Sequence, residues 1–201
     1  MPAGLHYYVK NSDQAYAQAL KAGGISLYEP ANRDYGDREA GVEDPSGNFW
    51  FVSTHREGKD YKPDVLQDLN TYFSVKDSAR FLDFLKRTFA AEALEHHAAG
   101  DGSIAHAKVR VGDTVFELSE GRQPWGPRAV SHHLYVENCD EVFARGLANG
   151  CTELQPMANQ FYGDRSGSLV DAWGNHWYIA SHLEDLSPGE IADRAALAGS
   201  Q

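Results

Sequence analysis

The sequence has 201 residues, 42% of them hydrophobic and 11% aromatic, which is enough apolar material for one large or two small folded domains and argues against disorder. The formal net charge of −11 argues against a nucleic-acid partner and against an anionic membrane surface. The two cysteines, Cys139 and Cys151, are too few for a disulfide framework, and no signal peptide or membrane-spanning run is visible, so a cytoplasmic protein is expected.

Residues 4–55 contain the first set of predicted elements. The stretch from His6 to Val9 alternates as a strand does, and Asp13 follows where a helix N-cap is expected. The helical stretch ends at Gly23, and after a loop two short strands are joined by a turn at 46–48. The polar residues 56–67 are expected to form a linker.

Residues 69–119 carry a divergent version of the same plan. Leu69 to Val75 predicts a strand, and Asp77 or Ser78 is expected to cap a helix with an apolar stripe. Two strands, 104–111 and 114–118, follow around a Gly-Asp turn.

Residues 131–182 align with residues 4–55 without a gap, at a constant offset of 127, and 20 of the 52 aligned pairs are identical. The identical pairs include His6 with His133 and Asp13 with Asp140, and this degree of identity indicates a duplication. A short C-terminal helix is predicted to begin near Ser187-Pro188.

The region from 68 to about 196 resembles the PhnB-like subgroup of the vicinal oxygen chelate (glyoxalase, bleomycin-resistance and dioxygenase) superfamily. The motifs that carry the resemblance are Ile104-Ala105-His106-Ala107, Gln160-Phe161-Tyr162-Gly163-Asp164-Arg165, Asp171-Ala172-Trp173-Gly174-Asn175 and His182-Leu183-Glu184-Asp185-Leu186-Ser187-Pro188. The resemblance implies an α+β fold in which paired βαβββ modules form a cupped, barrel-like mixed sheet, here with one extra half module. The expected domains are an orphan half module (1–55), a linker (56–67), a complete two-module domain (68–186) and a C-terminal helix and tail (187–201).

The predicted strands alternate between an apolar face and a polar face rich in rings, which carries Tyr72, Glu117, His133 and Tyr178. Tyrosine and histidine fit a wet concave wall better than an ordinary outer face, although a plain solvated face remains the alternative. The resemblance implies that this face lines a cavity.

Metal-dependent members of the superfamily place one ligand on the first strand and one on the last strand of each module. The resemblance puts Asn70, Glu117, Ser131 and Tyr178 at those positions, and only Glu117 is a good ligand. The equivalents in residues 4–55 are Gly4 and Phe51. We therefore expect neither a metal nor another cofactor, and a relocated site of Glu117, His133 and His106 is the alternative.

If the protein is an enzyme without a metal, Glu117 and His133 are the expected catalytic pair. Desolvation beside Phe116 and Leu118 predicts a raised pKa for Glu117, as suits a general base, although a structural hydrogen-bonded carboxylate is an equal reading.

Three further residues are candidate ligand contacts. Tyr162 is placed to stack on a flat ligand and Arg165 to hold an anion, or the Asp164-Arg165 pair only braces its loop. Trp125, between the two expected modules, is either a lid or a hinge plug.

The preferred interpretation is a protein that sequesters a small, partly aromatic organic ligand in a concave cavity without metal. The expected ligand contacts are Asn70, Tyr72, His106, Glu117, Trp125, His133, Tyr162, Arg165 and Tyr178. The alternatives are a metal-dependent lyase, isomerase or dioxygenase with a displaced ligand set, and a module with a vestigial cavity that serves assembly.

An unpaired module exposes a sheet edge. We therefore predict a homodimer through residues 4–55, with a shared cavity lined by His6 and Phe51, unless an upstream module is missing.

Overall fold

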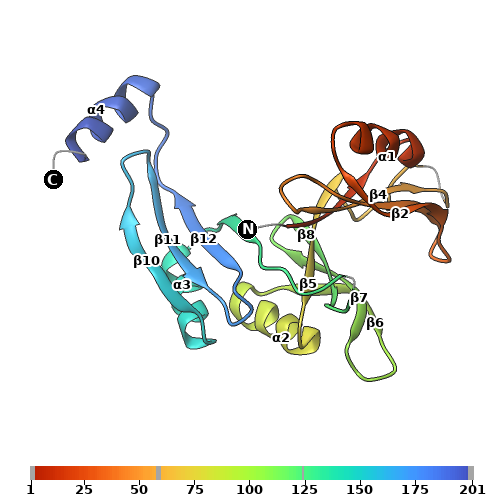
Figure 1. The fold of residues 1–201 in the computed structure, drawn as a ribbon. Coiled ribbons are helices and arrows are strands. Elements are labelled where there is room, and N and C mark those ends of the chain that lie inside the picture. Colours follow the sequence, from red (N-terminus) through yellow and green to blue (C-terminus); the bar gives the residue numbers. More distant parts are fainter. Residues whose placement is uncertain (1–2, 58–59, 124, 199–201) are drawn as a thin grey trace. The chain divides into compact units, whose positions relative to one another are not determined.

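The computed structural model describes residues 3–57, 60–123 and 125–198, which form three successive βαβββ modules followed by a helix (Figure 1). The first module comprises β1 (Gly4–Tyr8), α1 (Ser12–Lys21), β2 (Ile25–Asn32), β3 (Asp37–Glu43) and β4 (Phe49–His55). The second comprises β5 (Leu69–Val75), α2 (Ser78–Phe89), β6 (Glu92–Ala98), β7 (Ile104–Val111) and β8 (Thr114–Glu120). The third comprises β9 (Ser131–Tyr135), α3 (Cys139–Ala148), β10 (Thr152–Asn159), β11 (Asp164–Val170) and β12 (His176–His182), and α4 (Pro188–Ala198) follows. The predicted α+β fold of βαβββ modules is confirmed.

The sequence patterns did not indicate the first strand after the helix in any module, namely β2, β6 and β10. Each of these strands pairs with its neighbour through register shifts, for example between Ser26 and Tyr28 in β2 and between Glu153 and Gln155 in β10. A bulge inserts an extra residue and breaks the two-residue alternation on which strand prediction depends.

The chain divides into two compact units. The first unit contains the residues up to Asp83 together with Ala91–Val130, and the second contains Phe84–Ala90 together with the residues from Ser131 onward. The C-terminal half of α2 therefore belongs to the second unit.

The first unit contains an eight-stranded sheet of order β2-β3-β4-β1-β5-β8-β7-β6. Its two halves join where β1 pairs with β5 in antiparallel register, with Leu5 opposite Thr71 and Tyr7 opposite Leu69. The first module is thus paired with the second, and the expectation of an orphan over residues 1–55 beside a complete domain over 68–186 is wrong.

The segment that connects the first two modules packs against both of them. The backbone N–H of Tyr8 donates to the carbonyl of Asp68 at 2.7 Å. Leu66 is buried against Tyr8 and Val115, with Tyr61 packed beside them. The described part of residues 56–67 is therefore packed onto the first unit and is not a free linker.

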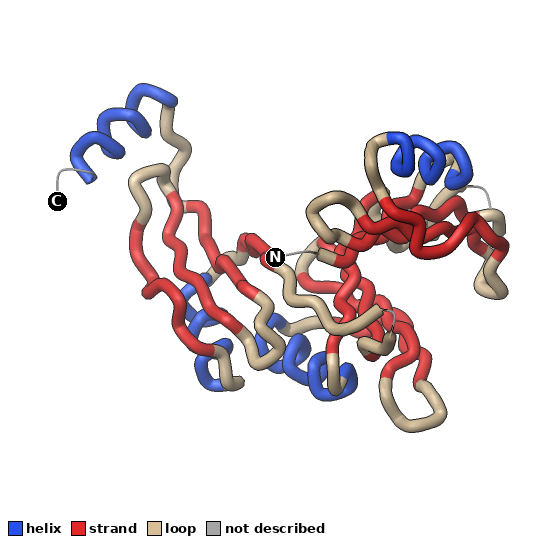
Figure 2. The backbone as a smooth tube through the Cα atoms, viewed as in Figure 1, coloured by secondary structure: helices blue, strands red, loops and turns tan. Residues whose placement is uncertain are grey.

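The second unit contains a four-stranded sheet of order β10-β11-β12-β9. In Figure 2, α3 lies behind the lower half of this sheet. Trp177 is fully buried, with its ring centroid 4.4 Å from that of Phe89, and Trp173 packs on Phe84. The two cysteines, Cys139 and Cys151, are free and buried.

The identical residues of the first and third modules form the same local contacts in both. Asp44 accepts hydrogen bonds from the side chains of Asn48 and Trp50, and Asp171 accepts the equivalent bonds from Asn175 and Trp177. These bonds fix the turn between the last two strands of each module, so much of the repeat is explained by the scaffold.

The caps of the duplicated helices correct another prediction. Asn11 and Asn138 cap α1 and α3 by accepting from the backbone N–H three residues on. Asp13 lies in the first turn, where its carboxylate accepts from the guanidinium of Arg38.

The predicted C-terminal helix begins at Pro188 as expected and is described as far as Ala198, and residues 199–201 of the expected helix and tail lie outside the described part of the chain. Among the described residues, no helix combines the length and the apolar character needed to cross a membrane.

Candidate functional site

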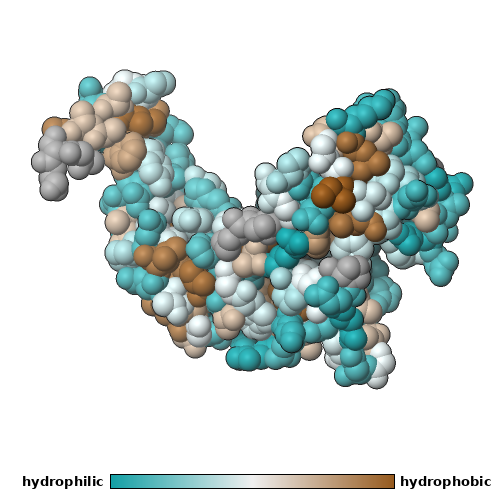
Figure 3. Space-filling model, viewed as in Figure 1, coloured by the Kyte–Doolittle hydropathy of each residue, from teal (hydrophilic) through white to brown (hydrophobic). Residues whose placement is uncertain are grey.

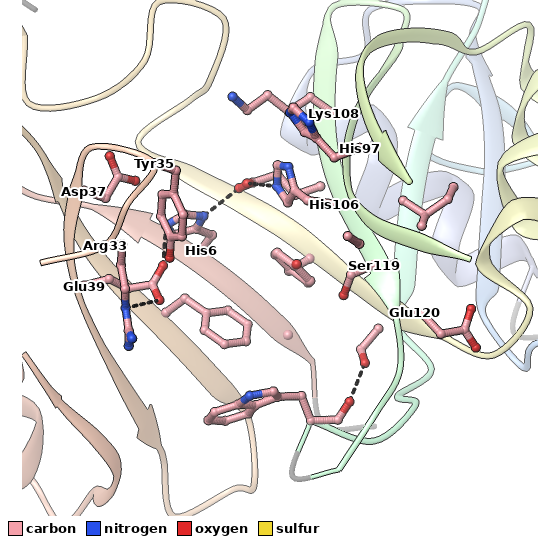
Figure 4. A pocket seen from close by; sticks show the side chains of 18 of the residues that line it. His6, Arg33, Tyr35, Asp37, Glu39, His97, His106, Lys108, Ser119 and Glu120 are labelled. Carbon is pink, nitrogen blue, oxygen red and sulfur yellow. Dashed lines mark hydrogen bonds and ion pairs between the residues drawn. The ribbon is translucent and has the colours of Figure 1, made fainter. Parts of the chain in front are cut away.

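A cavity of about 1050 Å³ lies in the first unit and is lined by residues of both its modules. One part of its lining is aromatic and another part is charged. Figure 4 shows the charged part, with His6 and Glu39 from the first module facing His106 from the second.

The aromatic wall is centred on Trp125, which lies between β8 and β9. Its ring packs edge-on against Tyr28, Phe49 and Phe51, at centroid distances of 5.4, 5.5 and 5.5 Å. The Oγ of Ser74 donates to the Trp125 carbonyl at 2.8 Å and fixes the segment that carries this ring. Trp125 is therefore part of the cavity wall.

The charged part is built around Glu117, which is only 2% exposed. Its Oε1 lies 2.8 Å from His6 Nδ1, and its Oε2 lies 3.0 Å from His106 Nε2. β1 brings His6 to this position and β8 brings Glu117, so the bond crosses from the first module to the second.

These contacts decide the charge of both partners. Burial raises the pKa of Glu117, but the charge of His6 and the hydrogen bonds from His106 and His6 outweigh it, so the pKa of the carboxyl falls below its ordinary value. Burial lowers the pKa of His6, yet Glu117, Glu39 and Asp37 outweigh that effect and raise it. The expected raised pKa for Glu117 is therefore wrong, because desolvation was considered there without the imidazole partner.

Glu39 is a second buried carboxylate in the lining. The Tyr28 hydroxyl donates to its Oε1 at 2.5 Å, and the Ser53 hydroxyl to its Oε2 at 3.3 Å. Ser53 Oγ also lies 2.8 Å from His6 Nε2. A continuous chain of polar contacts thus runs from Tyr28 through Glu39, Ser53, His6 and Glu117 to His106.

The sequence analysis did not identify Glu39, Tyr28 or Ser53. A signal was present, because the third module carries Ser166, Gln155 and Ala180 at the corresponding positions, whereas the scaffold residues are identical. These three members of the polar chain therefore differ between the two copies, whereas lining residues such as His6 and Asp37 are identical in both.

Of the predicted ligand contacts, Tyr72, His106, Glu117 and Trp125 line this cavity. Asn70 does not, because its side-chain amide is bonded to the backbone of Gln67 in both directions.

The other predicted contacts, His133, Tyr162, Arg165 and Tyr178, belong to the second unit. Both terminal carboxylate oxygens of Asp140 accept from Arg165, at 2.6 and 2.7 Å. Arg165 is thus already paired and braces its loop, which was the alternative reading of the sequence.

The positions implied for a metal do not form a ligand set in the first unit. They hold Gly4, Phe51, Asn70 and Glu117, and both oxygens of Glu117 are bonded to imidazoles. The relocated set required His133, which lies in the other unit. Within the described ranges, no group of three or more His, Cys, Asp or Glu side chains has an arrangement suited to a metal ion.

Comparison with known proteins places these features in context. No family model matches the sequence. The uncharacterized protein Mb0911c of Mycobacterium bovis is 29% identical over 134 residues, which are 61% of this chain and 88% of the relative. The uncharacterized protein Rv0887c of Mycobacterium tuberculosis is equally similar, over 79% of its length.

The solved structures that are similar to the chain include an actinomycete protein and a plant enzyme. TioX from Micromonospora sp. ML1 matches with a TM-score of 0.50 and 25% identity, over 56% of this chain and 95% of TioX. Glyoxalase I from Zea mays matches with a TM-score of 0.63 and 16% identity, over 98% of this chain and 70% of the maize protein. At that identity the maize protein shows the fold alone.

Proposed function

We propose that this chain, which shares the fold of the vicinal oxygen chelate superfamily, is a member of it and that the cavity of its first unit binds a small, partly aromatic organic ligand. The observation that carries the proposal is the aromatic wall around Trp125, which shares one cavity with the polar chain from Glu39 to His106. Pockets for organic ligands typically combine apolar and aromatic walls with a few well-placed polar groups.

The size of the cavity supports a ligand of considerable size. Its volume of about 1050 Å³ lies just above the usual range for such sites, roughly 300–1,000 Å³. We infer that rings of the ligand pack against Trp125, Phe49 and Phe51, while its polar groups point toward Glu39 and His106.

Binding without chemistry is favoured over catalysis by the state of Glu117. A general base needs a pKa near the working pH and a free lone pair facing the substrate. Glu117 has a lowered pKa, and each of its oxygens already accepts from a histidine. The pair His6–Glu117 therefore acts as a fixed polar part of the wall.

The experiment that tests this proposal compares a residue of the cavity with the equivalent residue of the third module as a control. Phe51 in the cavity and Tyr178 in the second unit occupy equivalent positions in β4 and β12. A thermal-shift screen of aromatic antibiotics and metabolites selects a ligand, since a compound that binds the folded state raises its stability. Titration calorimetry then compares the two alanine variants.

Phe51→Ala is expected to weaken binding by about 1–3 kcal/mol, because a buried ring contact is lost. Tyr178→Ala should leave the affinity unchanged. The opposite pattern would move the site to the second unit, and a metal bound stoichiometrically and lost with Glu117→Ala would favour the metal-dependent alternative.

A further inference from the structure

Among the described residues, four arginine and lysine side chains line the first-unit cavity, and three of them are already bonded to other groups of the protein. These bonds run from Lys108 to Glu95, from Arg122 to Asp101, and from Arg128 to the carbonyl of Gly47. The fourth cation is Arg33. Its guanidinium donates no hydrogen bond to any residue that the structure describes.

Arg33 is nevertheless held in place, and Figure 4 shows it beside Glu39 on the first-module side of the cavity. Its Nε lies 3.6 Å from Glu39 Oε1, and its guanidinium carbon lies 4.5 Å from the centre of the Tyr28 ring. The Nε atom is buried and has no hydrogen-bond partner within the described part of the chain. Burial of a donor without an acceptor is unfavourable, so such an atom is typically satisfied by a ligand or by water.

The acceptors in this part of the cavity are, by contrast, occupied. Each carboxylate oxygen of Glu117, Glu39 and Asp37 is hydrogen-bonded to a histidine, a tyrosine or a serine of the first unit. A cationic group of a ligand therefore meets no oxygen of these carboxylates that lacks a partner. An acceptor group of a ligand meets the unused donors of Arg33.

Two aromatic rings of the lining are also covered by cations of the protein itself. Arg33 lies over the Tyr28 ring, and the guanidinium carbon of Arg128 lies 3.4 Å from the centre of the Phe49 ring. A cationic ligand would compete with these arginines for the ring faces. The cavity therefore favours a ligand whose polar end accepts hydrogen bonds and is neutral or anionic.

The third module indicates that the scaffold does not require an arginine at this position. The equivalent of Arg33 is Gln160, and the backbone N–H of each donates at 2.7 Å, to the carbonyl of Asp37 and of Asp164 respectively. The backbone is thus fixed in the same way in both copies, whereas the charged side chain is present only in the copy that contains the cavity.

We propose that Arg33 binds an oxyanion of the ligand, so that the ligand of this cavity is an aromatic acid. This inference rests on the proposed function and names the chemical class of its ligand. The rings of the acid pack against Trp125 and Phe51, and its carboxylate or similar oxyanion accepts from the planar guanidinium, whose geometry matches such groups. The nearby charge of Glu39 is offset, because Arg33 and His6 lie 3.6 and 3.8 Å from its oxygens.

Two fluorescent dyes with the same ring system test the proposal. Anilinonaphthalene sulfonate carries an oxyanion, and phenylnaphthylamine is its neutral parent. Both fluoresce more strongly on leaving water, so titration gives a dissociation constant for each. Arg33→Gln should raise the dissociation constant of the sulfonate roughly tenfold or more and that of the neutral dye less than about twofold, because only a charge-assisted hydrogen bond is lost.

The matched control is Arg122→Gln. It removes the same charge from the same lining, but from a guanidinium that is already bonded to Asp101 and Ser103. Its side chain is 57% exposed, so both dissociation constants should stay within about twofold of their native values.

A further variant shows where the dyes bind, since exposed hydrophobic residues elsewhere also attract them. Figure 3 shows such residues on the visible face over the part of the second unit that contains β10, where Leu154 is 49% exposed. Phe51→Ala should weaken the binding of both dyes if they occupy the cavity. Circular dichroism confirms that each variant is folded.

The outcomes separate this proposal from the proposed function. Equal weakening of both dyes by Arg33→Gln would overturn the proposal, because Arg33 would then be only a part of the wall, and so would an equal effect of Arg122→Gln on the sulfonate. If the neutral dye binds in a manner that depends on Phe51 and the sulfonate does not bind, this proposal fails and the proposed function stands. If neither dye binds, or neither depends on Phe51, both fail.

Discussion

Replacement of Glu117 by glutamine tests the central electrostatic claim about the first unit. The change keeps the size of the side chain and removes its charge. His6 then remains almost completely buried without its anionic partner, and one of the two imidazoles faces an amide N–H in place of a carboxylate oxygen. Removal of one member of a buried ion pair costs about 3–5 kcal/mol, and the lower end is expected here because His6 can release its proton.

The dependence of this loss on pH follows from the two shifted pKa values. The pKa of His6 is raised above 6.5, so its contribution to stability is complete below that value and is lost as the pH rises through the pKa of the folded state. The pKa of Glu117 is lowered below 4.5, so its contribution is complete above that value and is lost as the pH falls through the folded pKa. The difference between the native chain and Glu117→Gln should therefore be largest between about pH 4.5 and 6.5.

The assay is urea unfolding at pH 5.5 and at pH 9, with Glu95→Gln as the matched control. Glu95 also accepts from a histidine and a lysine, at 2.7 and 2.6 Å, but its side chain is 37% exposed. Exposed pairs contribute about 0–1 kcal/mol, so this control should lose little. Equal losses for the two variants, or a loss for Glu117→Gln that is the same at both pH values, would refute the reasoning.

Two further predictions concern the duplicated scaffold. Asn11→Ala and Asn138→Ala should each lower the free energy of unfolding by about 1 kcal/mol, because each removes the side-chain acceptor that caps its helix. Denaturant titrations measure this loss, and a loss of stability in only one of the two variants would contradict the equivalence of the caps. Arg165→Ala should cost less than about 1 kcal/mol, since its pair with Asp140 is exposed, and calorimetry should find ligand affinity in the first-unit cavity unchanged.

The bounds of the βαβββ modules could be predicted from the sequence alone, because the contacts that define each module join residues that are close in the sequence. Asp44 accepts hydrogen bonds from Asn48 and Trp50, which follow it by four and six positions. Asp171 accepts the equivalent bonds from Asn175 and Trp177, at a constant offset of 127 residues. A module can therefore be delimited without knowledge of its neighbours. The bulged strands escaped detection because their pattern of exposure is irregular.

Only the tertiary structure decided which modules pair, and with that the location of the site. Strand edges carry backbone groups that any other strand can satisfy, so the sequence of β1 does not specify β5 as its neighbour. The bond from His6 to Glu117 joins residues 111 positions apart. It reverses the direction that desolvation alone gives to the pKa of Glu117, because the charge of a residue's spatial neighbour is decided by packing and not by adjacent sequence.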